Sequence, residues 1–159
     1  MLVAVPKEIK GNETRVALVP ESVKKLVSSG LTVHIESGLG EYCRFDDDKY
    51  REAGAEVISD RKALLASADM VVRVNKPPED EIDLLKSGCI HISYLDPFNE
   101  KPLVEKLAAA GILAVSMELI PRTTKAQKMD ALSSQASLAG YVAVIQAAEY
   151  LDAVFPMMT

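Results

Sequence analysis

The sequence predicts an α/β fold: a Rossmann-like or flavodoxin-like open, mostly parallel sheet with helices on both faces, followed by a long C-terminal connecting helix. The main observation is a pattern in which an amphipathic helix, a glycine and a short apolar strand follow one another repeatedly. Strands that alternate with helices of roughly ten residues pair in parallel, because each helix crosses back over the sheet in a right-handed connection. The apolar runs are also rich in branched residues, which is typical of buried parallel strands.

The predicted strands lie at residues 2–6, 32–36, 55–58, 70–74, 90–95 and 113–119. The predicted helices occupy residues 19–30, 46–54, 79–88 and 100–111. Each of these helices ends on a glycine, which suits a left-handed C-cap because no Cβ opposes a positive φ. The glycines are Gly30, Gly54, Gly88 and Gly111. Pro20 and Pro102 stand in the first turn of a helix, where proline is tolerated.

The last element differs, since residues 131–153 read as a helix with apolar side chains on nearly every side. Such a helix requires burial all round. A single sheet domain cannot easily surround it, so we expect a connecting helix that packs against a second domain or a second subunit. Residues 1–130 then form the α/β domain and residues 131–159 the connecting segment. Pro156 is expected to end the helix.

Composition places the chain among soluble globular proteins, with one domain or one domain and a tail in 159 residues. The net charge of -5 argues against a nucleic-acid partner, which favours clustered Lys and Arg. The two cysteines form neither a disulfide framework nor a zinc spacing, so a reducing compartment fits best. We find no signal or transit peptide and no apolar run of the ~18 residues that span a bilayer, so any membrane link is expected to come through a partner.

A polar loop at residues 7–21 follows the first predicted strand, at the edge where open α/β sheets bind ligands. Lys7 and Arg15 are therefore placed to meet an anion. The alternative is a solvated loop in which Arg15 pairs with a carboxylate such as Glu8. Spacing alone leaves both interpretations open.

Several other polar features favour structural roles. Gly38-x-Gly40 follows a strand but lacks the third glycine of a dinucleotide fingerprint, so it predicts a turn. The acidic run at residues 46–48 favours a helix N-cap over a metal site. Residues 77–83, PPEDEID, read as a solvated turn and helix cap. Isolated side chains without ligand partners at metal spacing are expected to be packed or at the surface: His34, His91 and Cys89.

Residues 122–141 form a polar, hydrogen-bond-rich loop that runs into an alanine-rich helix. Arg122 is a forked donor suited to a carboxamide oxygen or a phosphate, Asp130 can accept from an amide, and Ser133 can do either. Gln127 can reach a second ligand. The alternative is that Asp130 simply caps the following helix while Gln127 and Ser133 are solvated. Chemistry alone leaves the ligand-holding loop and the structural cap equally open.

The start of the chain resembles two related families. Pro6-Lys7-Glu8 follows the first strand, and Arg15-Val16-Ala17 ends the loop after it. Alanine dehydrogenases and the alpha subunits of transhydrogenases both open in this way. The resemblance covers essentially the whole chain.

Later residues separate these two families. Alanine dehydrogenases carry a substrate-binding Lys where Asn75 stands in RVNKPP, and a catalytic His where Asp96 follows Tyr94-Leu95. Without that Lys and His only Arg15 remains, so holding pyruvate and moving its proton is hard to arrange. QKMDALSSQ, AGY and FPMMT instead resemble proton-translocating NAD(P) transhydrogenases. The chain is therefore similar to the N-terminal domain of a transhydrogenase alpha subunit.

This resemblance implies a clamp in which Arg122, Thr123, Asp130 and Ser133 hold the nicotinamide of NAD(H). Gln127 would reach toward NADP(H) on a partner domain. The implied activity is that of a Re/Si-specific, proton-translocating NAD(P)+ transhydrogenase, in which hydride passes directly between the two nicotinamides. Catalysis would depend on positioning, because no acid or base is needed.

The resemblance also implies what accompanies the chain. In that family an NAD-binding Rossmann domain with a glycine fingerprint follows FPMMT, so residues 131–159 lead toward a missing domain. The chain is then a truncated subunit, the product of a split gene or a deliberately shortened piece, inactive alone and with weak or no NAD affinity.

The implied partners are that Rossmann domain, an NADP-binding component and a membrane proton channel. We expect a homodimer that is cytoplasmic and held at the inner membrane by its partner subunits, without direct membrane insertion. The alternatives are an alanine-dehydrogenase-like NAD-dependent oxidoreductase domain and a non-catalytic assembly module.

Overall fold

In the computed structural model of the chain, residues 1–155 are described. The chain divides into two compact units, Met1–Ser116 and a second that starts at Met117. We call them the sheet unit and the loop-helix unit, and each is described by itself. The polar loop at residues 122–130 and the helix that follows it lie in the same unit.

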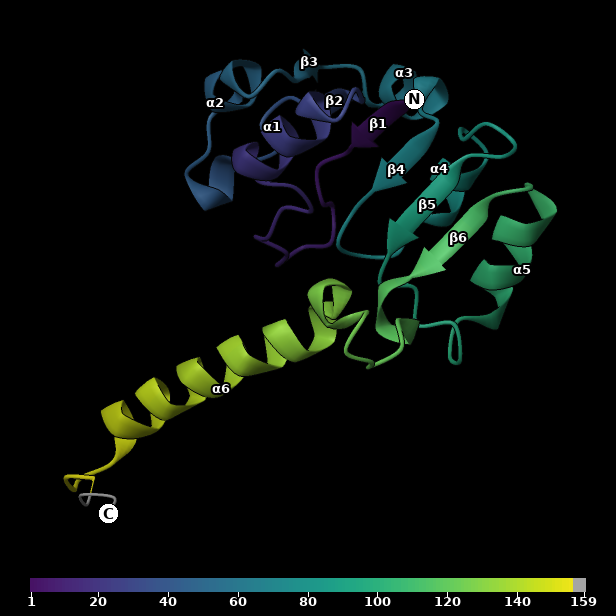
Figure 1. Cartoon of the computed structure of the whole chain (residues 1–159). Coiled ribbons are helices and arrows are strands. Elements are labelled where there is room, and N and C mark those ends of the chain that lie inside the picture. Colours follow the sequence, from purple (N-terminus) through teal and green to yellow (C-terminus); the bar gives the residue numbers. More distant parts are fainter. Residues whose placement is uncertain (156–159) are drawn as a thin grey trace. The chain divides into compact units, whose positions relative to one another are not determined.

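Within residues 1–155, six parallel strands form one sheet in the order β3-β2-β1-β4-β5-β6 (Figure 1). The strands lie where the sequence predicts them: β1 (Leu2–Val5), β2 (Thr32–Glu36), β3 (Glu56–Ile58), β4 (Met70–Val72), β5 (Ile90–Ser93) and β6 (Leu113–Ser116). β1 lies at the centre, with Val3 in register with Val33 on one side and Met70 on the other. This strand order is that of a Rossmann fold rather than a flavodoxin-like one. The predicted fold class is confirmed.

Five helices of the sheet unit connect these strands: α1 (Pro20–Ser28), α2 (Asp47–Glu52), α3 (Arg61–Ser67), α4 (Glu79–Ile82) and α5 (Lys101–Ala109). The sequence pattern does not predict α3, which Asp60 caps by accepting hydrogen bonds from two backbone N–H groups. α4 is shorter than the helix predicted for residues 79–88. Leu84 N and Leu85 N bond to carbonyls three residues back, so the chain leaves the helix in tight turns.

Helices pack on both faces of the sheet, and each face has its own apolar core. On one face α1 and α2 pack against β1 and β2, around the buried Ile35 and Tyr50. On the other face α3, α4 and α5 pack against β1, β4 and β5, around the buried Leu64 and Leu107. The aliphatic core expected from the composition therefore forms two layers, one on either side of the central strands.

The sheet face that carries α1 and α2 is less well covered over β4, β5 and β6. Side chains in register form two apolar rows across these strands: Met70, Ile90 and Leu113, and Val72, Ile92 and Val115. At the edge strand, Leu113 is 61% exposed and Val115 41% exposed. An exposed apolar sheet surface of this kind is suited to a further packing layer.

The loop-helix unit contains the 3₁₀ turns η2 (Met117–Leu119) and η3 (Gln127–Met129) and the helix α6 (Ala131–Tyr150). α6 ends before the predicted limit at residue 153, and Pro156, which the sequence predicts to end the helix, lies outside the described residues. The apolar side chains along α6 are exposed, including Leu138, Tyr141 and Val144. In the part of the chain that the structure describes, no helix is long and apolar enough to cross a membrane.

Candidate functional site

The strand order of the sheet reverses between β1 and β4, its central pair. Ligands of open parallel sheets bind outside the carboxyl ends of the strands at such a switch point. The loop after β1 carries Glu8, Glu13 and Arg15, and Asn75 follows β4. These side chains are therefore the first candidates for a site in the sheet unit.

Arg15 forms a two-point ion pair with Glu13: its Nε lies 2.8 Å from Glu13 Oε1 and its Nη2 2.7 Å from Glu13 Oε2. Asn75 Nδ2 donates to the same Glu13 Oε2 at 3.0 Å. Hydrogen bonds from Arg15 lower the pKa of Glu13 to about 2, against the opposing effect of burial. The pairing alternative for Arg15 is thus observed, with Glu13 as the carboxylate. Glu8, named from the sequence, instead accepts hydrogen bonds from the backbone N–H groups of Val74 and Asn75.

A network of ion pairs ties the carboxyl ends of the strands together. Glu81 of α4 accepts from Arg61 Nε at 2.7 Å and from Arg73 Nη1 at 2.8 Å. Arg61 also donates to Glu36, at the end of β2, and to the carbonyl of Lys7. Burial acts to raise the pKa of Glu81, but the hydrogen bonds and charges of the two arginines outweigh it and hold that pKa below its usual value.

Glu81 corrects one prediction, because only 8% of this residue is exposed. The sequence predicts a solvated turn at residues 77–83. In the folded chain two arginines surround the carboxylate, one at the first residue of α3 and one just after β4. A charged residue can be buried when such partners compensate it.

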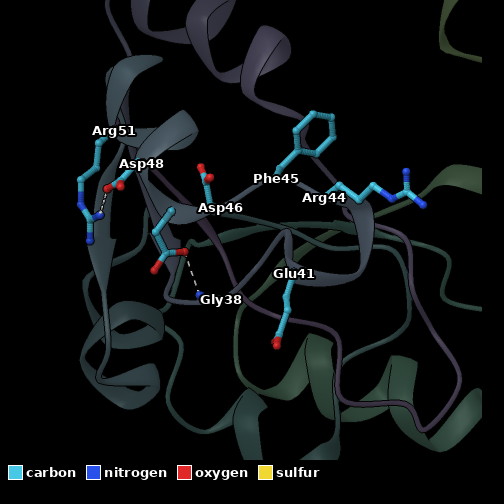
Figure 2. A pocket seen from close by; sticks show the side chains of 8 residues that line it. Gly38, Glu41, Arg44, Phe45, Asp46, Asp48 and Arg51 are labelled. Atoms are coloured by element: carbon cyan, nitrogen blue, oxygen red, sulfur yellow. Dashed lines mark hydrogen bonds and ion pairs between the residues drawn. The ribbon is translucent and has the colours of Figure 1, made fainter.

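A surface pocket of about 540 Å³ surrounds the 3₁₀ turn η1 (Glu41–Cys43) and the start of α2 (Figure 2). Its acidic side chains have structural partners: Asp46 accepts from Lys49 N, Asp47 from Gly38 N and Asp48 from Arg51 Nη1. The N-cap predicted for this acidic run is confirmed. Because a carboxylate already takes the Gly38 N–H, Gly38-x-Gly40 forms a turn, as predicted, rather than a phosphate cradle.

The isolated histidines and Cys89 have structural positions, as predicted. His91 is buried, and burial together with the charge of Arg73 lowers its pKa to about 4. His34 lies 3.1 Å from Glu56. Cys89 lies in the core, where desolvation raises its pKa. Among residues 1–155, no group of three or more His, Cys, Asp or Glu side chains could hold a metal ion.

In the loop-helix unit, one pocket of about 270 Å³ brings together all the residues that the sequence singled out. It is lined by Arg122, Thr123, Thr124, Gln127, Asp130 and Ser133. Successive tight turns fold the loop back on itself, since Ala126 N bonds to Thr123 O at 3.0 Å and Met129 N to Ala126 O at 2.8 Å. Ala126 is buried and anchors these turns.

Asp130 is the N-cap of α6, because its Oδ1 accepts a hydrogen bond from Ser133 N at 2.9 Å. Hydrogen bonds from the side chain and backbone of Ser133 lower the pKa of Asp130, helped by the positive charge of Arg122. The carboxylate is therefore ionised near neutral pH and acts only as an acceptor. A carboxylate accepts several hydrogen bonds, so the capping role and a ligand-binding role are compatible.

The groups around this pocket match the amide end of a nicotinamide. Arg122 provides N–H donors for a carbonyl oxygen, and Asp130 provides an acceptor for an amide NH₂. Gln127 and Ser133 can donate and accept. This combination suits the recognition of a neutral carboxamide better than the recognition of a simple anion, because a carboxylate and a guanidinium stand side by side.

Comparison with known proteins identifies the family. Residues 4–139 match the family described as alanine dehydrogenase/PNT, N-terminal domain. The chain belongs to this family. Membership confirms the resemblance inferred from the motifs at the start of the chain.

Individual relatives of this alanine dehydrogenase/PNT domain include both kinds of enzyme. The chain is 43% identical to an NAD(P) transhydrogenase subunit alpha protein of Rhodospirillum rubrum, over 99% of this chain and 42% of that protein. The crystal structure of a transhydrogenase from Sinorhizobium meliloti superposes with a TM-score of 0.91 and 44% identity, covering 99% of this chain and 47% of that one. Alanine dehydrogenase 2 of Staphylococcus aureus is 34% identical over 96% of this chain and 40% of its own length. The chain thus spans less than half the length of these relatives.

The structure also shows what the sequence interpretation missed in this alanine dehydrogenase/PNT domain. Thr124 lines the loop pocket together with Thr123, and its place in the same polar loop was the available signal. Glu13 lies only two residues from Arg15, a spacing that could have named it as the partner. The roles of Arg122 and the other lining residues stay predictions, since the pocket shows only that they lie together.

Proposed function

We propose that this chain is the N-terminal part of the NAD(H)-binding component of a proton-translocating NAD(P) transhydrogenase. The observation that carries the proposal is the pocket that joins Arg122, Thr123, Gln127, Asp130 and Ser133. The transhydrogenase relatives of Rhodospirillum rubrum and Sinorhizobium meliloti support it. The reaction is Re/Si-specific, direct hydride transfer between NAD(H) and NADP(H).

In this proposal the residues of the loop bind and orient, and NAD(H), when bound, supplies or accepts the hydride. Arg122 donates to the carboxamide oxygen of the nicotinamide, and Asp130 accepts from its NH₂ group. Thr123 and Ser133 add hydrogen bonds that fix the orientation of the ring. Gln127 meets the NADP(H) that a partner domain presents. Since only hydride moves, positioning is the contribution that these side chains make.

The proposal includes partners that complete the site. A Rossmann domain would bind the adenosine and pyrophosphate of NAD(H), an NADP-binding component would hold the second nucleotide, and a membrane component would conduct protons. The exposed apolar side chains of α6 support packing against such a second domain and a homodimer. Residues 1–130 would then be the N-terminal domain, and residues 131–159 its connection, on the cytoplasmic side of the inner membrane.

The test is reconstitution with a chain that carries the glycine-rich NAD-binding domain and with the NADP-binding component. Stopped-flow absorbance then follows hydride transfer from NADH to an NADP⁺ analogue. Gln127→Ala should slow the transfer step by about 10–100-fold, because small misplacement of the reacting groups has effects of this size. Gln146→Ala is the matched control, since it removes the same amide from α6 outside the pocket. An unchanged rate in Gln127→Ala would contradict the clamp and favour a non-catalytic assembly module.

A second measurement addresses whether the site is complete in this chain. We expect an NADH fluorescence titration of the chain alone to show weak or no binding, and the absence of tryptophan keeps the signal simple. Saturable binding at micromolar NADH would contradict the incomplete site.

Alanine dehydrogenase activity is supported less well, although alanine dehydrogenases are relatives. Asn75 holds Glu8 and Glu13 through its amide. Asp96, at φ 54°, accepts a hydrogen bond from Asn99 at 2.8 Å. Neither side chain supplies the cation or the imidazole that this chemistry would use. Turnover of L-alanine with NAD⁺ would favour that alternative.

A further inference from the structure

The pocket of about 480 Å³ at the switch point of the sheet has an unusual internal arrangement. Its lining includes Arg15 and Asn75, which donate hydrogen bonds, and Lys10, which adds positive charge. Glu13 lines the same pocket. A cationic pocket at the carboxyl ends of β1 and β4 is where an anionic ligand of an open sheet would bind. Here a carboxylate of the chain itself lies in that position.

The geometry of the Glu13 carboxylate is that of a bound ligand. The guanidinium of Arg15 meets both of its oxygens, at 2.8 and 2.7 Å, in the planar two-point arrangement that favours carboxylates. The backbone N–H of Arg15 adds a third bond at 2.9 Å, and Asn75 adds a fourth at 3.0 Å. Two segments far apart in the sequence therefore converge on one small anion.

Burial differs between the two partners in a way that matters for access. The Glu13 side chain is 10% exposed, whereas the Arg15 side chain is 48% exposed. The guanidinium can thus be reached from solvent, while the carboxylate that satisfies it is enclosed. The hydrogen bonds keep Glu13 ionised well below neutral pH, so this arrangement persists over the physiological range.

We propose that Glu13 is an internal occupant of a carboxylate-binding site formed by Arg15 and Asn75, and that it excludes small carboxylate ligands from this pocket. Glu13 is in this sense a specificity-determining residue. The proposal concerns the sheet unit alone and does not depend on nucleotide binding by the loop at residues 122–133. Removing the Glu13 side chain should convert the pocket into a site for monocarboxylates.

The experiment is a titration of the full chain with sodium acetate, at constant ionic strength maintained with sodium chloride. Two-dimensional ¹H–¹⁵N NMR reports the Nε–H signal of Arg15, assigned by its loss in Arg15→Gln. In the wild-type chain this signal should not respond to acetate in a saturable way. In Glu13→Ala it should shift saturably, with an apparent affinity at least about tenfold higher than any response of the wild type. Glu13→Gln, which keeps the side-chain shape, should show the same change to a smaller degree and serves if Glu13→Ala fails to fold.

Two controls identify the site. Glu21→Ala removes an equal charge from an exposed i,i+4 ion pair and should leave the acetate response unchanged. Adding Arg15→Gln to Glu13→Ala should abolish the gained binding, with backbone amide signals taking over as the readout. The proposal is overturned if folded Glu13 variants do not gain acetate binding, if the wild type binds acetate equally well, or if the gain persists without Arg15.

Discussion

Replacing Glu81 with alanine should destabilise the sheet unit by about 3–5 kcal/mol, which is typical when one partner of a buried ion pair is removed. Glu81 lies between Arg61 and Arg73, and the Arg73 side chain is only 2% exposed. After the substitution Arg61 still pairs with Glu36, whereas Arg73 keeps its charge in a site closed to water. Within the described residues, Arg73 Nε already lacks a hydrogen-bond partner, so this guanidinium should account for most of the loss.

Urea unfolding followed by far-ultraviolet circular dichroism measures the effect. The free energy of unfolding changes by about 1–3 kcal/mol per molar urea, so a loss of about 3 kcal/mol lowers the midpoint by about 1 M or more. Asp80→Ala is the control, because Asp80 is exposed on the same helix and should change stability by less than about 0.5 kcal/mol.

A double variant sharpens the test of the network. Glu81→Met combined with Arg73→Met should recover most of the lost stability, because replacing a whole buried ion pair with apolar side chains is often neutral. The reasoning is refuted if Glu81→Ala costs less than about 1 kcal/mol, or if the double variant is less stable than Glu81→Ala.

Three further predictions concern single residues. The pKa of His91 falls from 6.5 to about 4 on folding, so its contribution to stability is complete above about pH 6.5 and is lost as the pH falls toward 4. The loss is about 3 kcal/mol at 1.36 kcal/mol per pKa unit; His91→Asn should flatten this part of the pH–stability profile, and an unchanged profile would exclude His91 as its cause. Gly40→Ala should destabilise the chain by about 1–3 kcal/mol in urea unfolding, because the new Cβ would lie 2.4 Å from the Phe45 carbonyl oxygen. Gly11→Ala meets open space and should have little effect, so equal losses would argue against the steric explanation. Asp130→Asn should preserve the helical circular dichroism that Asp130→Ala reduces, yet slow hydride transfer in the reconstituted complex; a normal rate would mean that Asp130 is a cap and nothing more.

Much of the fold could be predicted because its signals are local. Branched runs between glycine-ended helices mark all the strands of the described sheet, and the positive φ of Gly30, Gly54 and Gly111 follows from the lack of a Cβ. α3 escaped prediction because its seven residues are too few for a clear apolar period. α4 was predicted too long because its sequence pattern does not show where i→i−3 bonds replace helical ones.

The candidate site could be predicted for the same reason. The residues from Arg122 to Ser133 lie within one short loop, so their proximity in space follows from their proximity in the chain. The cap formed by Asp130 is likewise a contact between residues three positions apart. What these side chains bind is a separate question, which the sequence addresses only through its resemblance to transhydrogenases.

By itself, then, the sequence determined the strands, the glycine caps, the polar loop and the family to which the chain belongs. Only the tertiary structure decided the Rossmann strand order, the burial of Glu81 between Arg61 and Arg73, and the hold of Asn75 on Glu13. The physical reason is the range of the interactions. Local conformational preferences act over a few residues, whereas a buried charge depends on partners that chain folding brings from 20 or 62 positions away.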